Sequence, residues 1–129
     1  MATGAKTGDA VFALRYGIFR LLLSVLGLGP GLSGVTVGAE RVRVRMGWGF
    51  RADIPRSSVG QATSDGGLVG GIGIHGWRGR WLVNGAASGL VRLQIEPPER
   101  AWVMGVPVRL RQLRVSVEDP DGLLGALAR

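Results

Sequence analysis

The sequence contains no cysteine and only one histidine, His75. Without cysteine the chain can form no disulfide, thiolate zinc site or cysteine nucleophile. No aspartate, glutamate or second histidine lies within nine residues of His75 on either side. A catalytic base needs an orienting partner, and a metal ion needs three or four ligands. We therefore predict no catalytic residue and no metal site, and interpret His75 as a loop or structural residue.

A long apolar run is also absent. The most apolar stretch, residues 17–29, is interrupted by Arg20 and Ser24 and is shorter than the ~20 residues that a membrane-spanning helix needs. A leader peptide is the alternative interpretation of this stretch, but the residues before it already alternate like a strand. We expect a cytoplasmic protein, with peripheral attachment to a membrane as an open alternative.

Acidic residues are few compared with basic ones. Sixteen basic side chains, all arginine except Lys6, face nine acidic ones, which gives a net charge of +7. A GC-rich genome accounts for the preference for arginine over lysine, but it does not account for the sign of the charge. The excess predicts an acidic partner: an acidic protein, an anionic membrane surface or, as the weaker alternative, nucleic acid.

The length fits one domain over residues 9–129, preceded by a small polar tail over residues 1–8. Short segments that alternate apolar and polar residues, separated by Gly and Pro, predict an antiparallel sheet. The expected strands are 11–16, 35–37, 41–46, 50–54, 59–63, 80–83, 89–95, 101–104 and 108–117, with a short helix over 18–26. We expect 80–83 and 89–95 to pair as a hairpin that ends at Pro97-Pro98.

The last predicted strand changes its alternation near Gln112, which indicates a β-bulge or a break there. Asp119 then fits a helix N-cap and Pro120 the first helical position, with Leu123, Leu124 and Leu127 on one face. The predicted fold is mainly β: an antiparallel, partly open barrel or sandwich with a short C-terminal helix.

Several short motifs follow the order of elements in a known family. They are Leu26-Gly27-Leu28-Gly29-Pro30-Gly31, Val35-Thr36-Val37, Arg43-Val44-Arg45-Met46-Gly47, Ile54-Pro55-Arg56-Ser57-Ser58-Val59, Leu82-Val83-Asn84, Gly89-Leu90-Val91 and Val115-Ser116-Val117-Glu118-Asp119-Pro120. With them the chain resembles the bacterial pleckstrin-homology-like domains, specifically a group found in actinobacteria. The resemblance implies two packed antiparallel sheets closed at one end by the C-terminal helix, and it implies no activity. The basic phosphoinositide-binding motif of the eukaryotic domains is not recognisable.

Residues 71–76 match the G-x-G-x-x-G dinucleotide fingerprint. With 23 glycines in the chain such a match carries little information, and the βαβ unit with its acidic residue is missing. We therefore predict no cofactor. No G-x-S-x-G elbow is present either. The sequence thus favours a binding or adaptor domain over an enzyme, while a small-molecule or enzymatic site inside the barrel stays an alternative.

The arginines alternate with apolar residues in two segments. Because an unpaired guanidinium is costly to bury, these strand faces must be wet, paired or occupied by an anion. Tryptophans lie nearby, at Trp48 and in the Trp77–Trp81 segment, where they either pack or stack on bases. The candidate surface for an anionic partner comprises Arg41, Arg43, Arg45, Arg109, Arg111, Trp77, Arg78, Arg80 and Trp81. The alternative is a solvated face whose arginines pair with acidic residues.

Overall fold

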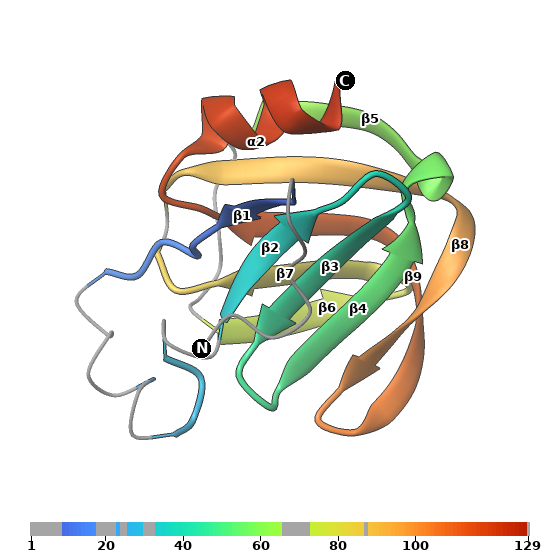
Figure 1. The fold of residues 1–129 in the computed structure, drawn as a ribbon. Helices are drawn as coiled ribbons and strands as arrows, with labels where there is room; N and C mark the ends of the chain where they lie inside the picture. Colours follow the sequence, from blue (N-terminus) through green and yellow to red (C-terminus); the bar gives the residue numbers. More distant parts are fainter. Residues whose placement is uncertain are drawn as a thin grey trace.

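The computed structural model describes residues 9–17, 23, 26–29, 33–65, 73–86 and 88–128 (Figure 1). The predicted tail and most of the helix predicted over 18–26 lie outside this part of the chain. The described residues form one sheet of nine strands, a short 3-10 turn η2 and a helix α2. Their bounds are β1 (Ala10–Phe12), β2 (Ser33–Val37), β3 (Arg41–Met46), β4 (Phe50–Pro55), η2 (Arg56–Ser58), β5 (Val59–Asp65), β6 (Gly73–Trp77), β7 (Arg80–Asn84), β8 (Leu90–Val103), β9 (Val106–Ser116) and α2 (Pro120–Leu127).

The strands follow the order β1-β2-β3-β4-β8-β9-β7-β6, and β5 pairs with β8 beside β4. All pairs are antiparallel except β7 with β9, which is parallel. The sheet is open, with β1 and β6 as its ends, but it wraps so that β2, β3 and β4 lie in front of β6 and β7 (Figure 1). The mainly β fold with one short C-terminal helix is therefore confirmed.

The core lies between these two layers. In β3, Val42, Val44 and Met46 are fully buried, while the arginines between them face outward. Phe50, the largest fully buried side chain, begins β4 and continues the same inward face. The alternation that predicted these strands thus also determines which side of each faces the core.

The chain beyond β1 joins the two layers. Arg15 N–H donates to the carbonyl of Ser116 at 2.8 Å, and Glu118 N–H donates to the carbonyl of Ala13 at 2.9 Å. Leu14 is buried in the core, and Phe12 and Tyr16 pack against it. The predicted strand 11–16 therefore continues past β1 as single bridges to the ends of β9 and β7.

The predicted hairpin between 80–83 and 89–95 is wrong. β7 pairs with β6 and with β9, and β9 lies between β7 and β8 in the sheet. Gly85 N–H donates to Ser116 Oγ at 3.0 Å, and Val117 N–H donates to the carbonyl of Gly89 at 2.9 Å. A short loop between two strands favours their pairing, but a strand from later in the sequence can still lie between them.

The expected strand end at Pro97-Pro98 is also wrong, because β8 continues through both prolines. They lie where β8 exchanges its partner β5 for β4 and where its register with β9 shifts, between Gln94 and Glu99. Proline donates no hydrogen bond, and this interruption of the ladder requires none. The register with β9 does shift near Gln112, as predicted, but the extra residues belong to β8, between Gln94 and Glu99, and not to β9.

Helix α2 lies across β5 and β8 (Figure 1). As predicted, Asp119 is its N-cap, with Oδ1 accepting from Gly122 N–H at 3.0 Å, and Leu123 is fully buried. The Arg56 guanidinium donates to the carbonyl of Ala126 in the last turn at 2.5 Å and to the carbonyl of Gly38 at 2.9 Å. No helix in the described part of the chain has the length and apolarity to cross a bilayer.

Candidate anion-binding surface

The outward residues of four neighbouring strands form one basic face. Strand register places Arg45 opposite Arg51, Arg51 opposite Trp102, and Trp102 opposite Pro107. The next row contains Arg43 opposite Asp53, and Arg100 opposite Arg109. We call this surface the arginine face; it comprises Arg41, Arg43, Arg45, Arg51, Arg100, Trp102 and Arg109.

Asp53 is the acidic member of these rows. Its Oδ1 lies 2.6 Å from Arg41 Nε, and its Oδ2 lies 3.4 Å from Arg43 Nε. The side chains of Arg41 and Asp53 are each 47% exposed, so this pair contributes at most about 1 kcal/mol to stability. The alternative of a solvated face with paired arginines therefore describes Arg41 and Arg43, and the face carries six arginines and one aspartate.

Arg51, Arg100 and Trp102 were missed by the sequence-based prediction. The guanidinium carbon of Arg51 lies 5.5 Å from the Trp102 ring centroid, and that of Arg100 lies 6.0 Å away. Neither arginine has a carboxylate within 4.0 Å among the described residues. Arg51 and Asp53 are two residues apart in β4, and Arg100 and Trp102 are two residues apart in β8. Each pair therefore faces one side of its strand, as the arginines of β3 do. Recognising it required knowing that β8 continues past Pro98 and pairs with β4.

A second basic cluster surrounds the turn between β6 and β7. The carbonyl of Gly79 accepts from Arg111 N–H at 2.8 Å, which holds this turn against β9. Trp77 is 75% exposed, and the Arg78 guanidinium carbon lies 5.7 Å from its ring centroid. We call Trp77, Arg78, Arg80 and Arg111 the Trp77 cluster. The structure thus brings the predicted residues of 77–80 next to the arginines of β9.

Trp81 has a different position from Trp77. It is half-buried, packs against the core cluster, and lies so close over Gly76 that a Cβ there would be 2.1 Å from its ring. The packing interpretation therefore holds for Trp81. His75 lies in β6 in register with Leu82, so residues 73–76 belong to a strand and not to the strand-to-helix turn that a dinucleotide site requires.

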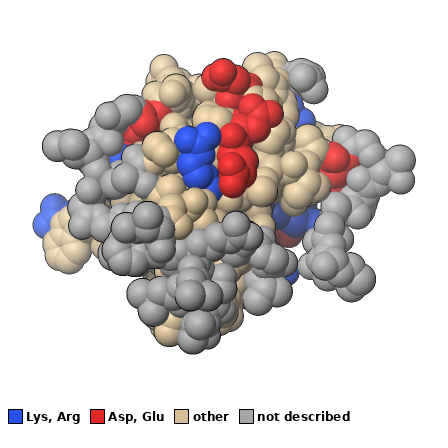
Figure 2. All heavy atoms as spheres, turned by 90° about the vertical axis from the view of Figure 1, so that its left-hand side faces the viewer, with Lys and Arg blue, Asp and Glu red and all other residues tan. Residues whose placement is uncertain are grey.

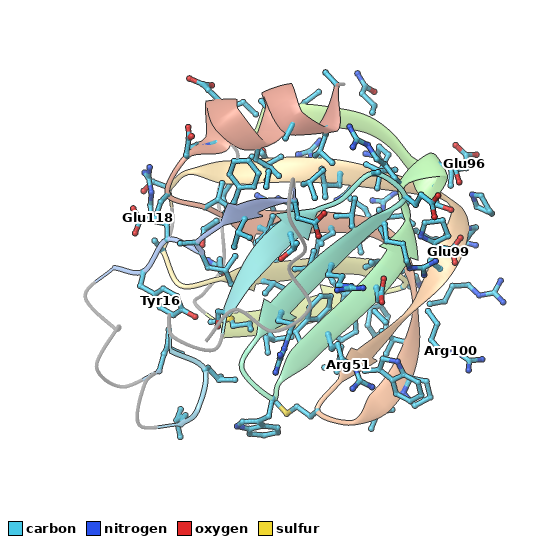
Figure 3. The ribbon with its side chains drawn as sticks, viewed as in Figure 1. Tyr16, Arg51, Glu96, Glu99, Arg100 and Glu118 are labelled. Atoms are coloured by element: carbon cyan, nitrogen blue, oxygen red, sulfur yellow. The ribbon has the colours of Figure 1, made fainter. Side chains whose placement is uncertain are left out.

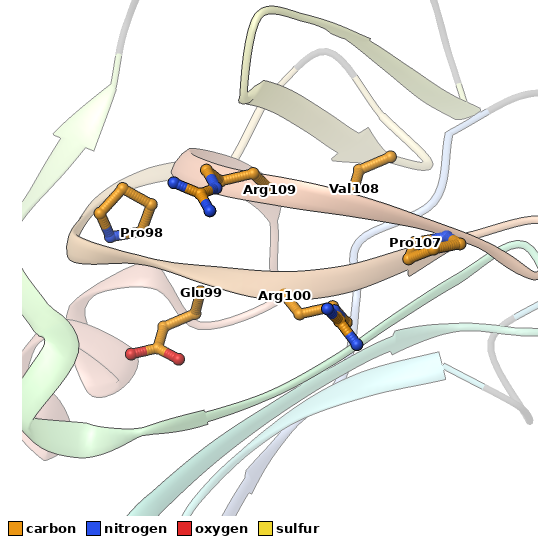
Figure 4. Close-up of a pocket in the computed structure, with 6 residues that line it drawn as sticks. All are labelled: Pro98, Glu99, Arg100, Pro107, Val108 and Arg109. Atoms are coloured by element: carbon orange, nitrogen blue, oxygen red, sulfur yellow. The ribbon is translucent and has the colours of Figure 1, made fainter.

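A shallow pocket of about 400 Å³ lies beside the arginine face, on the hairpin formed by β8 and β9 (Figure 4). Its lining comes from β8 and β9 and consists of Pro98, Glu99, Arg100, Pro107, Val108 and Arg109. Glu99 accepts a hydrogen bond from Ser58 Oγ at 2.6 Å, whereas Arg100 and Arg109 have no carboxylate within 4.0 Å among the described residues. The pocket lies outside the core, and two of its lining residues, Arg100 and Arg109, carry guanidinium groups.

Acidic residues gather elsewhere. Glu118, Asp119 and Asp121 lie at the junction of β9 with α2, and Figure 2 shows a stripe of acidic side chains on that side of the molecule. In Figure 3, Glu118 lies on the opposite side from Arg51 and Arg100, whereas Glu96 and Glu99 lie beyond Arg100 at the bend of β8. The charge is therefore distributed unevenly, with a basic face and an acidic junction.

A hydroxyl pair supports the turn between β3 and β4, beside the arginine face. Tyr16 Oη donates to the carbonyl of Leu28 and lies 2.9 Å from Ser33 Oγ. Ser33 Oγ accepts from Gly47 N–H at 3.1 Å and donates to the carbonyl of Gly29 at 2.8 Å. Burial raises the pKa of Tyr16 above its ordinary value, and the hydrogen bond with Ser33 opposes this effect in part.

The raised pKa of Tyr16 predicts a loss of stability at alkaline pH. The unfolded chain releases the phenol proton at a pH of about 10, before the folded chain does, so the free energy of unfolding falls as the pH rises above about 10. Tyr16 is the sole tyrosine of the chain, so phenolate absorbance reports this group directly. We expect its titration in the folded protein at higher pH than in guanidinium chloride; coincident or reversed titrations would contradict a buried hydroxyl.

Comparison with protein-family models, curated proteins and solved structures finds no match to this chain. Within the described residues, no three His, Cys, Asp or Glu side chains come together as metal ligands.

Proposed function

We propose that this chain is a non-catalytic docking domain of pleckstrin-homology-like architecture that binds an anionic surface, either an acidic protein or an anionic membrane. The observation that carries the proposal is the arginine face, where six arginines from four strands surround one aspartate and one tryptophan. Such a face attracts anions over distances comparable to the Debye length and contacts phosphate or carboxylate groups directly.

The packing of the face supports this proposal. Arg45 and Arg51 lie directly opposite each other, an arrangement of like charges that destabilises a sheet. An anion bound between these two side chains would reduce this repulsion. The Trp77 cluster is adjacent through Arg109 and Arg111 and would extend the same contact.

Nucleic acid is the second candidate. It is favoured by the exposed ring of Trp77 with a guanidinium beside it, since flat aromatic and guanidinium groups together suit the stacking of unpaired bases. Retention on single-stranded oligonucleotides that is lost on Trp77→Ala and unaffected by Arg51→Ala would favour this candidate.

The experiment for the main proposal is a binding titration with vesicles that contain phosphatidylglycerol, and in parallel with an acidic polypeptide, at about 50 mM and about 300 mM salt. We expect binding to at least one of these surfaces at low salt and much weaker binding at high salt. Because each basic residue near an anionic membrane contributes about 1 kcal/mol, the double variant Arg51→Ala with Arg100→Ala should bind vesicles roughly 30-fold more weakly.

The matched control is Lys6→Ala with Arg129→Ala, which removes the same charge from the two ends of the chain. We expect this control to change the affinity less than the variant of the arginine face. Absence of binding to every anionic surface at low salt would overturn the proposal, and so would an equal loss in the two double variants, since only net charge would then matter.

A further inference from the structure

Two adjacent hairpin turns carry large apolar side chains that the core does not use. Trp48, in the turn from β3 to β4, is 61% exposed; in the β8–β9 hairpin, Met104 of the turn is 54% exposed and Val106, the first residue of β9, is 60% exposed. Met104 N–H donates to the carbonyl of Gly49 at 2.8 Å, so the two turns are joined. Leu26 is also exposed and lies beside Trp48. We call Leu26, Trp48, Met104 and Val106 the apolar tip.

The polar atom of the exposed indole is already satisfied. Trp48 Nε1 donates to the carbonyl of Leu26 at 2.8 Å, and in the same turn Gly49 N–H donates to the carbonyl of Met46 at 3.1 Å. Transfer of an unpaired donor into hydrocarbon is costly, whereas a paired donor avoids most of that cost. The Trp48 side chain can therefore leave water without losing a hydrogen bond.

The conformation of Met104 is one that stability alone does not favour. Met104 and Gly105 have φ values of +50° and +81°, the two left-handed positions of a tight hairpin turn that prefers Asn-Gly. A methionine there is strained, and because its side chain is more than half exposed, packing does not compensate. The packing of the folded core therefore does not explain an apolar side chain at this position.

Charge begins directly behind the tip. The segments Met46–Phe50 and Trp102–Val108 contain no charged residue, and Arg45 and Arg51 form the first row behind the β3–β4 turn. Trp102, half-buried beside Arg51, lies at the same level. Apolar residues at the end, followed by tryptophan and arginine, match the order of acyl chains, interface and phosphate groups in a bilayer.

We infer that the bound surface is an anionic bilayer, and that the apolar tip inserts among its acyl chains while Arg45 and Arg51 contact the lipid phosphates. This inference rests on the proposed function and names its partner. The favoured partner is lipid because a flexible acidic polypeptide would compensate the arginines but would leave the apolar tip in water.

The test uses the full chain and vesicles of phosphatidylcholine with about 30% phosphatidylglycerol, an amount chosen to give a clearly negative surface. Trp48→Ser and Met104→Asn are each expected to weaken partitioning about tenfold or more, the loss expected for a large apolar side chain that no longer leaves water. Met104→Asn should leave the thermal midpoint unchanged or raise it, because Asn suits the left-handed turn position. The matched control Val11→Ser removes an equally exposed apolar side chain from β1 and should bind as the unmodified chain does.

Insertion is measured separately with lipids brominated in their acyl chains. We expect them to quench the tryptophan fluorescence of the bound protein, and we expect Trp48→Phe to remove much of that quenching. If Arg51→Ala with Arg100→Ala weakens vesicle binding while Trp48→Ser and Met104→Asn bind normally without quenching, the proposed docking function survives and insertion is wrong. If the unmodified chain binds the acidic polypeptide and not the vesicles, the inference is likewise overturned. Failure to bind any anionic surface would remove both.

Discussion

Gly47→Ala should lower the free energy of unfolding by about 3 kcal/mol or more, the range expected for severe overpacking combined with backbone strain. Gly47 has φ +55°, and a Cβ there would lie 1.8 Å from the carbonyl oxygen of Gly27 and 2.9 Å from Leu28 Cα. These are backbone atoms, so no rotamer change can relieve the overlap. The chain around Gly27 would have to move, and with it the carbonyl of Leu28 that accepts from Tyr16.

Gly105→Ala is the matched control, because Gly105 also has positive φ, +81°, yet no atom lies within 4 Å of the added Cβ. This variant should cost about 1 kcal/mol, the penalty of the left-handed conformation alone. Urea denaturation of both variants separates conformational strain from steric overlap. Equal losses would mean that the β3–β4 turn does not contact Gly27.

The local sequence pattern predicted the positions of the strands better than it predicted which strands pair with one another. The alternation Val42, Val44, Met46 appears directly in the sequence, and the structure buries these residues as expected. Pairing depends on residues distant in the chain, so a short loop from β7 to β8 gave no sign that β9 would lie between them. The prediction of a strand end at Pro97-Pro98 failed for a related reason. Prolines exclude a continuous ladder of hydrogen bonds, but β8 changes partners at that point and does not need a continuous ladder there.

The same distinction applies to the candidate surface. Three arginines of β3 could be assigned to one outward face because they belong to one strand. Arg51, Arg100 and Trp102 belong with them only through the register of β4 with β3 and β8, which the sequence does not display. The sequence also did not indicate which tryptophan side chains are exposed. Trp77 and Trp81 lie four residues apart, yet Trp77 lies at a turn and Trp81 packs against the core.

Residue type alone also does not separate structural arginines from surface ones. Arg56 donates to backbone carbonyls of the β2–β3 connection and of α2, so it stabilises the closure of the sheet by the helix. Arg92 and Arg114 are directly opposite in register, like Arg45 and Arg51, but they share a carboxylate from β5. Two facing arginines can therefore be part of the packing of the sheet, and register alone does not identify a binding surface.

Asp65 provides that shared carboxylate, and Asp65→Ala should lower the free energy of unfolding by about 2 to 3 kcal/mol. Its side chain is 4% exposed, with Oδ1 3.2 Å from Arg92 Nη2 and Oδ2 in contact with Arg114 Nε. Without it, two facing guanidinium groups would remain, one of them 19% exposed and the other 41% exposed. The partial exposure of Arg92 keeps the expected loss below that of a fully buried pair.

Asp53→Ala is the control for burial, because Asp53 also contacts two arginines but is 47% exposed, and its removal should cost less than about 1 kcal/mol. Replacing the whole buried group, Asp65→Leu with Arg92→Met and Arg114→Met, should recover most of the stability lost in Asp65→Ala, since no unpaired charge then remains. Chemical denaturation of the three variants measures these differences. If Asp65→Ala were no more harmful than Asp53→Ala, the two guanidinium groups would not depend on Asp65 for the compensation of their charge.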